Sequence, residues 1–517
     1  SDLGQLEVIK GAASALYGGQ ALGGVINLVS RRPAEAAEGE LILNATTEDG
    51  QDVSFYGAAP LAPGWSGSLL STFNHQAVRD LDHDGWIDMP GYDRRSVRPR
   101  LFWTGQGGAT AFVTLGAMTE DRFGGTLNGR LAPDGEPFPQ DQKTRRRDAG
   151  MVFERPIGDR LLAQVRASGL DQSHDHRFGY VLENDEHKTV LTEASVLVDG
   201  THASWVGGVA YQVDDYASDA FPVFDYRYEV PAVFAQVDRN LGENFAFAAS
   251  ARWDDHSVYG GQFSPRLSLL YRPGPWTFRA SWGEGFYAPT PFVEETEAAG
   301  LSRLQPLSGL HAEIAETASL DLGYASGAFE GGLTLFASDI DDAVRLETVA
   351  PDWVRMVNMA GGTRTRGAEV LARWRRSPRT ITASYLYVDA TEPNEAGTGR
   401  RDVPLTPRHS IGLVAMWEDH DRGRIGLEVY YTGEQPLADD PYRTESKPYF
   451  EIGLLGEIVL GRYRVFLNLE NLLDVRQTRE SPLIRPERAP DGRWTVDAWA
   501  PLEGFVANAG VRIRFGE

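Results

Sequence analysis

Residues 6–33 read LEVIKGAASALYGGQALGGVINLVSRRP, and no later part of the 517-residue chain has the same texture. Two short β-type runs, Leu6 to Ile9 and Val25 to Val29, flank a segment of Gly, Ala, Ser and Tyr. Five glycines between Gly11 and Gly24 permit left-handed turns and close approach of the backbone to its neighbours. The stretch therefore predicts a small globular piece packed inside a larger structure.

A phosphate-binding loop is the alternative for such a glycine-rich stretch. Lys10 and Gly11 come before the glycines here, whereas a phosphate loop ends in Gly-Lys-Ser/Thr at the start of a helix. The mismatch disfavours a nucleotide site. The sequence also lacks Gly-x-Ser-x-Gly, His-Glu-x-x-His and any cysteine, so we expect a protein that is not an enzyme.

Charge and hydropathy restrict the class of protein further. The chain has 50 basic and 73 acidic side chains, and this net charge of -23 argues against a nucleic-acid partner, because phosphate binding needs clustered Lys and Arg. No apolar run approaches the ~20 residues of a membrane-spanning helix. A transmembrane β-barrel, however, carries its apolar residues in alternation, so a mean hydropathy of -0.33 does not exclude one.

The chain from residue 40 to residue 515 consists of about 22 strand-like segments, which is the size of a plugged outer-membrane barrel. In the last one, Phe505 to Phe515, apolar residues occupy one face, while Arg512 and Arg514 occupy the other. Tight turns alternate with long connections, among which we expect loops at 171–187 and 214–229. This asymmetry predicts an all-β fold, a transmembrane antiparallel β-barrel. A soluble β-sandwich or propeller is the alternative, but no blade-length repeat is present.

Residues 6–33 resemble the end of the plug domain of TonB-dependent outer-membrane receptors. Ala12 stands where that family usually has Pro. Further strings look like the family's barrel-strand motifs, in the expected order: Phe263–Tyr271, Trp282–Pro289, Arg366–Glu369, Pro404–His409 and Asn468–Asp474. The resemblance implies two parts, the C-terminal part of a plug domain at 1–38 and the transmembrane β-barrel at 39–517. Its plug-motif positions are Glu7, Gly11, Tyr17, Gly18, Gly23, Gly24 and Asn27.

The resemblance also implies a function. Such a receptor takes up a scarce chelated nutrient through the bacterial outer membrane, driven by the periplasmic TonB protein, and we expect a monomer in outer-membrane lipid. Ser1 lies close to the motif with no signal peptide before it, so we expect the energy-coupling segment and most of the plug to precede residue 1.

Arginines and aromatic residues in the long connections suggest the ligand. Guanidinium groups suit anionic, oxygen-rich chelates, and aromatic rings could line the site. We expect a ferric siderophore of catecholate type; cobalamin and saccharide receptors are the alternatives, and a structural or adhesive barrel that transports nothing is an alternative of another class. The candidate ligand-binding residues are Arg122, Phe123, Arg130, Tyr287, Phe292, Arg303, Trp353, Arg479, Arg485 and Arg488.

The segment Asp80 to Asp88 resembles the first half of a calcium loop. Asp80, Asp82, Asp84 and Asp88 take positions one, three, five and nine, and a glycine takes position six. Position twelve is Gly91, so the usual closing glutamate is absent. We expect no required cofactor, with calcium in this outer loop as a possibility and a solvated acidic loop as the alternative.

Two histidines, His174 and His176, lie two residues apart and would share one face of a strand. A transition-metal site needs at least a third ligand, and no residue of suitable spacing is evident in the sequence. We therefore predict no metal site here.

Overall fold

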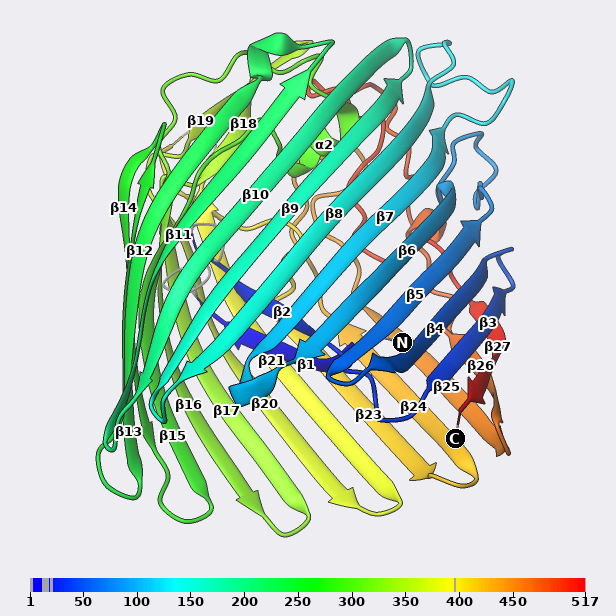
Figure 1. Cartoon of the computed structure of the whole chain (residues 1–517). Helices are drawn as coiled ribbons and strands as arrows, with labels where there is room; N and C mark the ends of the chain where they lie inside the picture. The colour runs from blue at the N-terminus through cyan, green and yellow to red at the C-terminus, as the bar shows by residue number, and fades with distance from the viewer. Residues whose placement is uncertain (1–2, 12–17, 19–21, 395–396, 517) are drawn as a thin grey trace.

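A computed structural model describes residues 3–11, 18, 22–394 and 397–516 of the protein. Within these residues, 22 antiparallel strands form a closed barrel, and a two-stranded sheet lies in its interior (Figure 1). The barrel strands are β3 (Glu38–Thr46), β4 (Gln51–Ala62), β5 (Trp65–Gln76), β6 (Gly91–Thr104), β7 (Thr110–Gly125), β8 (Pro139–Ile157), β9 (Leu161–Phe178), β10 (Val181–Asp199), β11 (Ala203–Ser218), β12 (Tyr226–Asn240), β13 (Phe245–His256), β14 (Gly260–Tyr271), β15 (Trp276–Tyr287), β16 (Glu313–Ser326), β17 (Phe329–Asp341), β20 (Thr363–Arg376), β21 (Arg379–Pro393), β23 (His409–Asp419), β24 (Gly423–Thr432), β25 (Tyr449–Leu460), β26 (Tyr463–Glu470) and β27 (Val506–Phe515).

The remaining elements are short. The inner sheet pairs β1 (Leu3–Lys10) with β2 (Gly24–Ser30), and an outer-loop hairpin pairs β18 (Val344–Ala350) with β19 (Trp353–Asn358). Strand β22 (Arg400–Asp402), helix α2 (Glu294–Ala299) and the 3-10 turns η1 (Gln106–Gly108), η2 (Pro222–Phe224) and η3 (Gln477–Arg479) lie in connections. Among the described residues, no helix is long and apolar enough to cross a membrane.

Strand β27 closes the barrel against β3, in a register that runs from Asn508 opposite Thr46 to Phe515 opposite Gly39. The predicted alternation of the last strand is confirmed at this seam. Arg512 and Arg514 point inward, and their guanidinium groups lie 3.8 and 3.6 Å from the buried Glu40 carboxylate. Phe505, just before the strand, and Phe515, at its end, are exposed on the outside.

The wall has an apolar outside and a charged inside. Outward side chains such as Leu267, Leu320 and Leu335 are exposed, as expected for a surface that contacts lipid. Inward side chains form ion pairs between strands, for example Arg166 of β9 with Glu193 of the adjacent β10 at 2.7 Å, and Arg98 of β6 with Asp148 of β8, across β7, at 2.6 Å. Pairing of this kind satisfies charges that the closed wall shields from bulk water.

The predicted loops at 171–187 and 214–229 are wrong in large part. Strands β9 and β10 extend through 171–187 and are joined by a turn at 179–180, while β11 and β12 leave only 219–225 between them. The segments are polar on both faces because they project above the apolar belt, so their sequence lacks the apolar and polar alternation of a membrane strand. Backbone pairing with neighbouring strands nevertheless continues along them.

Candidate ligand-binding site

Long connections on one rim fold over the barrel mouth (Figure 1). Their apolar side chains pack into two clusters. The first cluster joins the β5–β6, β7–β8 and β26–β27 connections through Trp86, Phe138 and Trp494. Phe138 stacks on Trp86 at 6.2 Å between ring centroids and meets Trp494 edge-on at 6.3 Å. These contacts give the outer loops a core of their own, which holds their polar side chains in fixed positions.

The second cluster attaches the β15–β16 connection and the β18–β19 hairpin to the inner wall. Leu301, Leu304 and Met356 are buried against Tyr216 of β11. Leu301 is also tied to β10, because its backbone N–H donates to the Glu183 carboxylate at 3.0 Å. The loops therefore form a cap attached to the strands.

Two of the predicted arginines, Arg303 and Arg488, come together in this cap. Both side chains pack on Gly492, since a Cβ placed there would lie 3.2 Å from Arg303 Cδ and 3.4 Å from Arg488 Nη2. Burial and the neighbouring Arg303 lower the pKa of Arg488 to about 10. The Arg488 guanidinium also stacks over the Phe138 ring at 4.7 Å.

Both arginines of this pair also bind polar groups of the neighbouring loops. Arg303 Nη1 donates to the Ala489 carbonyl and contacts the exposed Asp352 carboxylate, both at 3.0 Å, while Arg488 Nε donates to the Gly492 carbonyl at 2.8 Å. Two guanidinium groups so close together repel one another, and an oxygen-rich anion would relieve that repulsion. The pair is the strongest candidate for ligand contact among the predicted residues.

The other predicted arginines are mostly engaged elsewhere. Arg122 pairs with Glu120 at 3.4 Å, Arg479 pairs with Asp474, and the buried Arg485 pairs with Asp439 at 3.2 Å. Arg130 is exposed, and its side chain packs against Gly85 of the aspartate loop. The structure therefore does not gather all six arginines at one point.

The predicted aromatic residues separate as well. Phe123 alternates with the inward Arg122 on β7 and lies exposed on the outer face, away from the cap. Phe292 meets Tyr216 edge-on at 4.8 Å inside the second cluster, and Tyr287 ends β15 beside it. Trp353 is exposed at the start of β19, beside the turn of the β18–β19 hairpin.

The inner wall also has a row of aromatic residues that the sequence did not predict. Tyr216 of β11 stacks on Tyr226 of β12 at 5.6 Å, and Tyr226 stacks on Tyr228 at 4.5 Å. Tyr228 then meets His256 of β13 edge-on at 4.8 Å. In the sequence only the two-residue spacing of Tyr226 and Tyr228 signalled this row, and Tyr216 joins it because the β11–β12 register places it opposite Tyr226.

The aspartate loop folds back on its own backbone. The Asp80 carboxylate accepts the Gly85 N–H at 3.0 Å, and the Asp88 carboxylate accepts the Leu81 N–H at 2.6 Å. One carboxylate oxygen from each of Asp80, Asp82 and Asp88 lies within 4.8 Å of the others. Asp84 is not part of this group, and its carboxylate accepts the Trp86 N–H at 2.7 Å.

Two features make this acidic group suitable for a cation. Asp88 is only 3% exposed, and its Oδ1 atom and that of Asp80 are buried without a hydrogen-bond partner. Burial, reinforced by the carboxylates of Asp82, Asp84 and Asp80, raises the pKa of Asp88 to about 7. Buried oxygens without donors are what a hard cation such as calcium binds.

The plug motif forms part of the inner sheet. Asn27 Nδ2 of β2 donates to the Glu7 carboxylate of β1 at 2.8 Å, and Lys10 pairs with Glu369 on the barrel wall. Gly24 has φ 126, and a Cβ there would lie 2.4 Å from the Ile9 carbonyl oxygen, so the motif needs glycine at this position. Gly11 and Gly18 also have positive φ and lie beside the wall residues Thr317 and Arg252, whereas Gly23 borders open space and Tyr17 lies outside the described residues.

A closed barrel of this size, apolar outside, charged inside and containing a small inner sheet, belongs to the class of plugged outer-membrane β-barrels. The chain matches the family model described as TonB dependent receptor-like, beta-barrel, over residues 42–472. The protein is therefore a member of the TonB-dependent receptor family and a multi-pass β-barrel of the bacterial outer membrane. The family consists of receptors and transporters rather than enzymes.

Relatives agree with this assignment. The iron-regulated outer membrane virulence protein of Vibrio cholerae serotype O1 is 24% identical over 487 residues, which cover 87% of this chain and 72% of that protein. The siderophore receptor PirA from Acinetobacter baumannii superposes with a TM-score of 0.81 at 14% identity, covering 99% of this chain and 85% of that one. A double mutant of the ferric enterobactin receptor PfeA from Pseudomonas aeruginosa gives a TM-score of 0.81 at 16% identity, covering 99% of this chain and 85% of that one, and PfeA in complex with BCV-L6 gives 0.80 at 16% identity, covering 99% and 86%. At these identities the structural likeness establishes the fold.

Proposed function

We propose that this receptor takes up a ferric siderophore of catecholate type across the outer membrane, with energy from TonB. The observation that carries the proposal is the Arg303–Arg488 pair, held by the folded loops over the barrel mouth. Catecholate chelates of Fe³⁺ are anionic, and paired guanidinium groups stabilise such charge through charge-assisted hydrogen bonds. The relatives, which include an iron-regulated outer membrane virulence protein and a ferric enterobactin receptor, favour the same ligand class.

The experiment is quenching of intrinsic tryptophan fluorescence in the detergent-solubilised protein, which has 12 tryptophans. Ferric catecholate, ferric hydroxamate, cyanocobalamin and an oligosaccharide are titrated separately. We expect saturable quenching by the ferric catecholate. Saturation by cobalamin or the oligosaccharide alone would replace the proposed ligand, and quenching by none of them would favour a barrel that transports nothing.

Arginine variants test which residues carry the binding. Arg303→Ala with Arg488→Ala should weaken ferric catecholate binding about 10- to 1,000-fold, the range expected for losing one or two charge-assisted contacts. Arg479→Ala is the matched control, because Arg479 is exposed and paired with Asp474 away from Gly492. Equal losses in the double variant and the control would contradict the assignment of the pair.

We further propose that residues 1–38 are the C-terminal part of the plug and that the receptor works as a monomer in outer-membrane lipid. The position of β1 and β2 within the barrel supports the first statement (Figure 1). Leu6, Val8, Ile26 and Leu28 share one face of this sheet and are all more than half exposed, so the sheet has an apolar face available for packing.

A calcium ion in the aspartate loop is the second proposal. Asp80, Asp82 and Asp88 would provide its carboxylate ligands, and the ion would neutralise a buried carboxylate whose oxygen has no donor. The loop packs on the first cap cluster through Trp86, so calcium would stiffen the cap that also holds Arg488. Isothermal titration that gives no calcium heat above buffer would end this proposal.

A further inference from the structure

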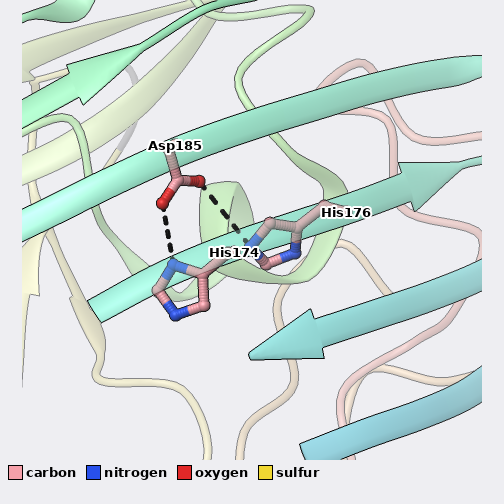
Figure 2. A group of neighbouring side chains, drawn as sticks. All are labelled: His174, His176 and Asp185. Atoms are coloured by element: carbon pink, nitrogen blue, oxygen red, sulfur yellow. Dashed lines mark hydrogen bonds and ion pairs between the residues drawn. The ribbon is translucent and has the colours of Figure 1, made fainter. Parts of the chain in front are cut away.

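Three potential metal ligands meet on the inner wall where β9 and β10 extend above the membrane belt. Figure 2 shows the imidazole rings of His174 and His176 and the carboxylate of Asp185 turned toward one another. One ligand atom from each residue lies within 4.8 Å of the other two. The three side chains are largely buried, with exposed fractions of 16, 19 and 9%.

Strand pairing produces this arrangement. His174 and His176 are two residues apart on β9 and so share one face, and Asp185 stands directly opposite His174 in the β9–β10 register. Strand β8 pairs with the other edge of β9, so hydrogen-bonded strands hold both histidines from both sides. The ligand that the sequence did not reveal is therefore a cross-strand neighbour eleven residues away in the chain.

The ligand atoms have the spacing that a small metal ion requires. His174 Nδ1 lies 2.7 Å from Asp185 Oδ1, and His176 Nε2 lies 3.7 Å from Asp185 Oδ2. Bonds of about 2.0–2.1 Å in a tetrahedron place ligand atoms roughly 3.3 Å apart. The two separations lie on either side of that value, so small side-chain rotations would bring both imidazoles and the Asp185 carboxylate to a common ion.

Surrounding side chains orient the three residues, as the hydrogen-bond partners of metal ligands do at known metal sites. The Gln172 amide lies 2.6 Å from His174 Nε2, which leaves Nδ1 directed at Asp185. His176 stacks on Phe178 at 5.7 Å, and Phe178 belongs to the first cap cluster. The rings are thus oriented by neighbours that are not themselves ligands.

We propose that His174, His176 and Asp185 bind one divalent transition-metal ion such as Zn²⁺, Ni²⁺ or Cu²⁺ on the inner wall. Two imidazoles with one carboxylate suit these ions, whereas calcium and magnesium prefer oxygen ligands alone. Three protein ligands leave at least one coordination position for water or another small ligand. The site is separate from both the Arg303–Arg488 pair and the aspartate loop, and it does not depend on the proposed siderophore.

The test is calorimetric titration of the full chain in detergent with Zn²⁺, in buffer with excess Ca²⁺ to occupy the aspartate loop. We expect one Zn²⁺ per chain, with at least tenfold weaker binding in each of Asp185→Asn, His174→Gln and His176→Gln. X-ray absorption of the zinc complex should indicate two imidazole ligands. Because three variants are compared, the conclusion does not depend on any single variant folding correctly. Circular dichroism checks that each variant is folded.

The matched control is His187→Gln. His187 also lies on the inner face of β10 and forms a pair with a carboxylate, at 2.5 Å from Asp214, but it is not part of the group of three. Its variant should bind Zn²⁺ within twofold of the unchanged protein. Absence of saturable Zn²⁺ binding, unchanged binding in Asp185→Asn, or an equal loss in His187→Gln would each overturn the proposal.

Discussion

The raised pKa of Asp88 makes a quantitative prediction about calcium binding. Asp88 is buried among other carboxylates, and its pKa rises from 3.8 to about 7. A shift of that size corresponds to about 4 kcal/mol of unfavourable free energy for the ionised carboxylate. Because the pKa is raised in the folded loop, this cost is absent below about pH 4 and grows until the pH passes 7. A bound calcium ion would offset it.

Calcium must therefore displace a proton from Asp88 at acidic pH. With a pKa of about 7, competition by one proton weakens the apparent affinity about tenfold at pH 6 and about 90-fold at pH 5, relative to pH 8. Calorimetric titration at the three pH values measures the change. Repeating the titration in buffers of different ionisation heat counts the protons released, and we expect about one per calcium at pH 6.

Two variants separate Asp88 from its neighbours. Asp88→Asn removes the titrating charge and should leave weak calcium binding that is almost independent of pH. Asp84→Asn is the matched control, since an amide oxygen can still accept the Trp86 N–H, and it should keep the pH dependence. Calcium affinity that differs by less than twofold between pH 5 and pH 8 in the unchanged protein would refute the reasoning.

Two further predictions concern the barrel seam and the inner sheet. Glu40→Gln should destabilise the barrel by about 1–3 kcal/mol, because two inward arginines lose their carboxylate. The change in stability is measured by heat-modifiable migration in SDS gels. Glu330→Gln is the control, because Glu330 lies in an exposed ion pair, and it should cost less than about 1 kcal/mol. Equal destabilisation by the two variants would contradict the role of Glu40 at the seam. Gly24→Ala should increase hydrogen exchange in β1, because its Cβ would collide with the Ile9 carbonyl oxygen. Gly23→Ala is the control, because a Cβ at Gly23 would have no atom within 4 Å. Similar hydrogen exchange in the two variants would contradict the proposed collision at Gly24.

The sequence was sufficient for the barrel because the relevant signals are local. Side chains of a membrane strand alternate between lipid and lumen, so a single segment such as 505–515 shows which of its residues face outward and which face inward. Each of the 22 predicted segments overlaps one barrel strand. The errors lie above the membrane belt, where water contacts the outer face and no longer requires apolar residues, as in 171–187.

The candidate sites depended on contacts between distant parts of the chain. The sequence proposed six arginines, and the structure brings only Arg303 and Arg488 together, because both pack on Gly492. The four aspartates at 80–88 were evident as a motif, but only the folded loop shows that Asp80, Asp82 and Asp88 form the group of three, while the Asp84 carboxylate accepts the Trp86 N–H.

The sequence by itself determined the family, the barrel and the inner glycine-rich piece, since each depends on residues close together in the chain or on a repeated period of two. Only the tertiary structure decided which polar side chains meet. Cross-strand register places Asp185 beside His174, and loop packing places Arg303 beside Arg488 across a long stretch of sequence. Such contacts depend on register and on loop conformation, and neither leaves a periodic signal in the amino-acid sequence.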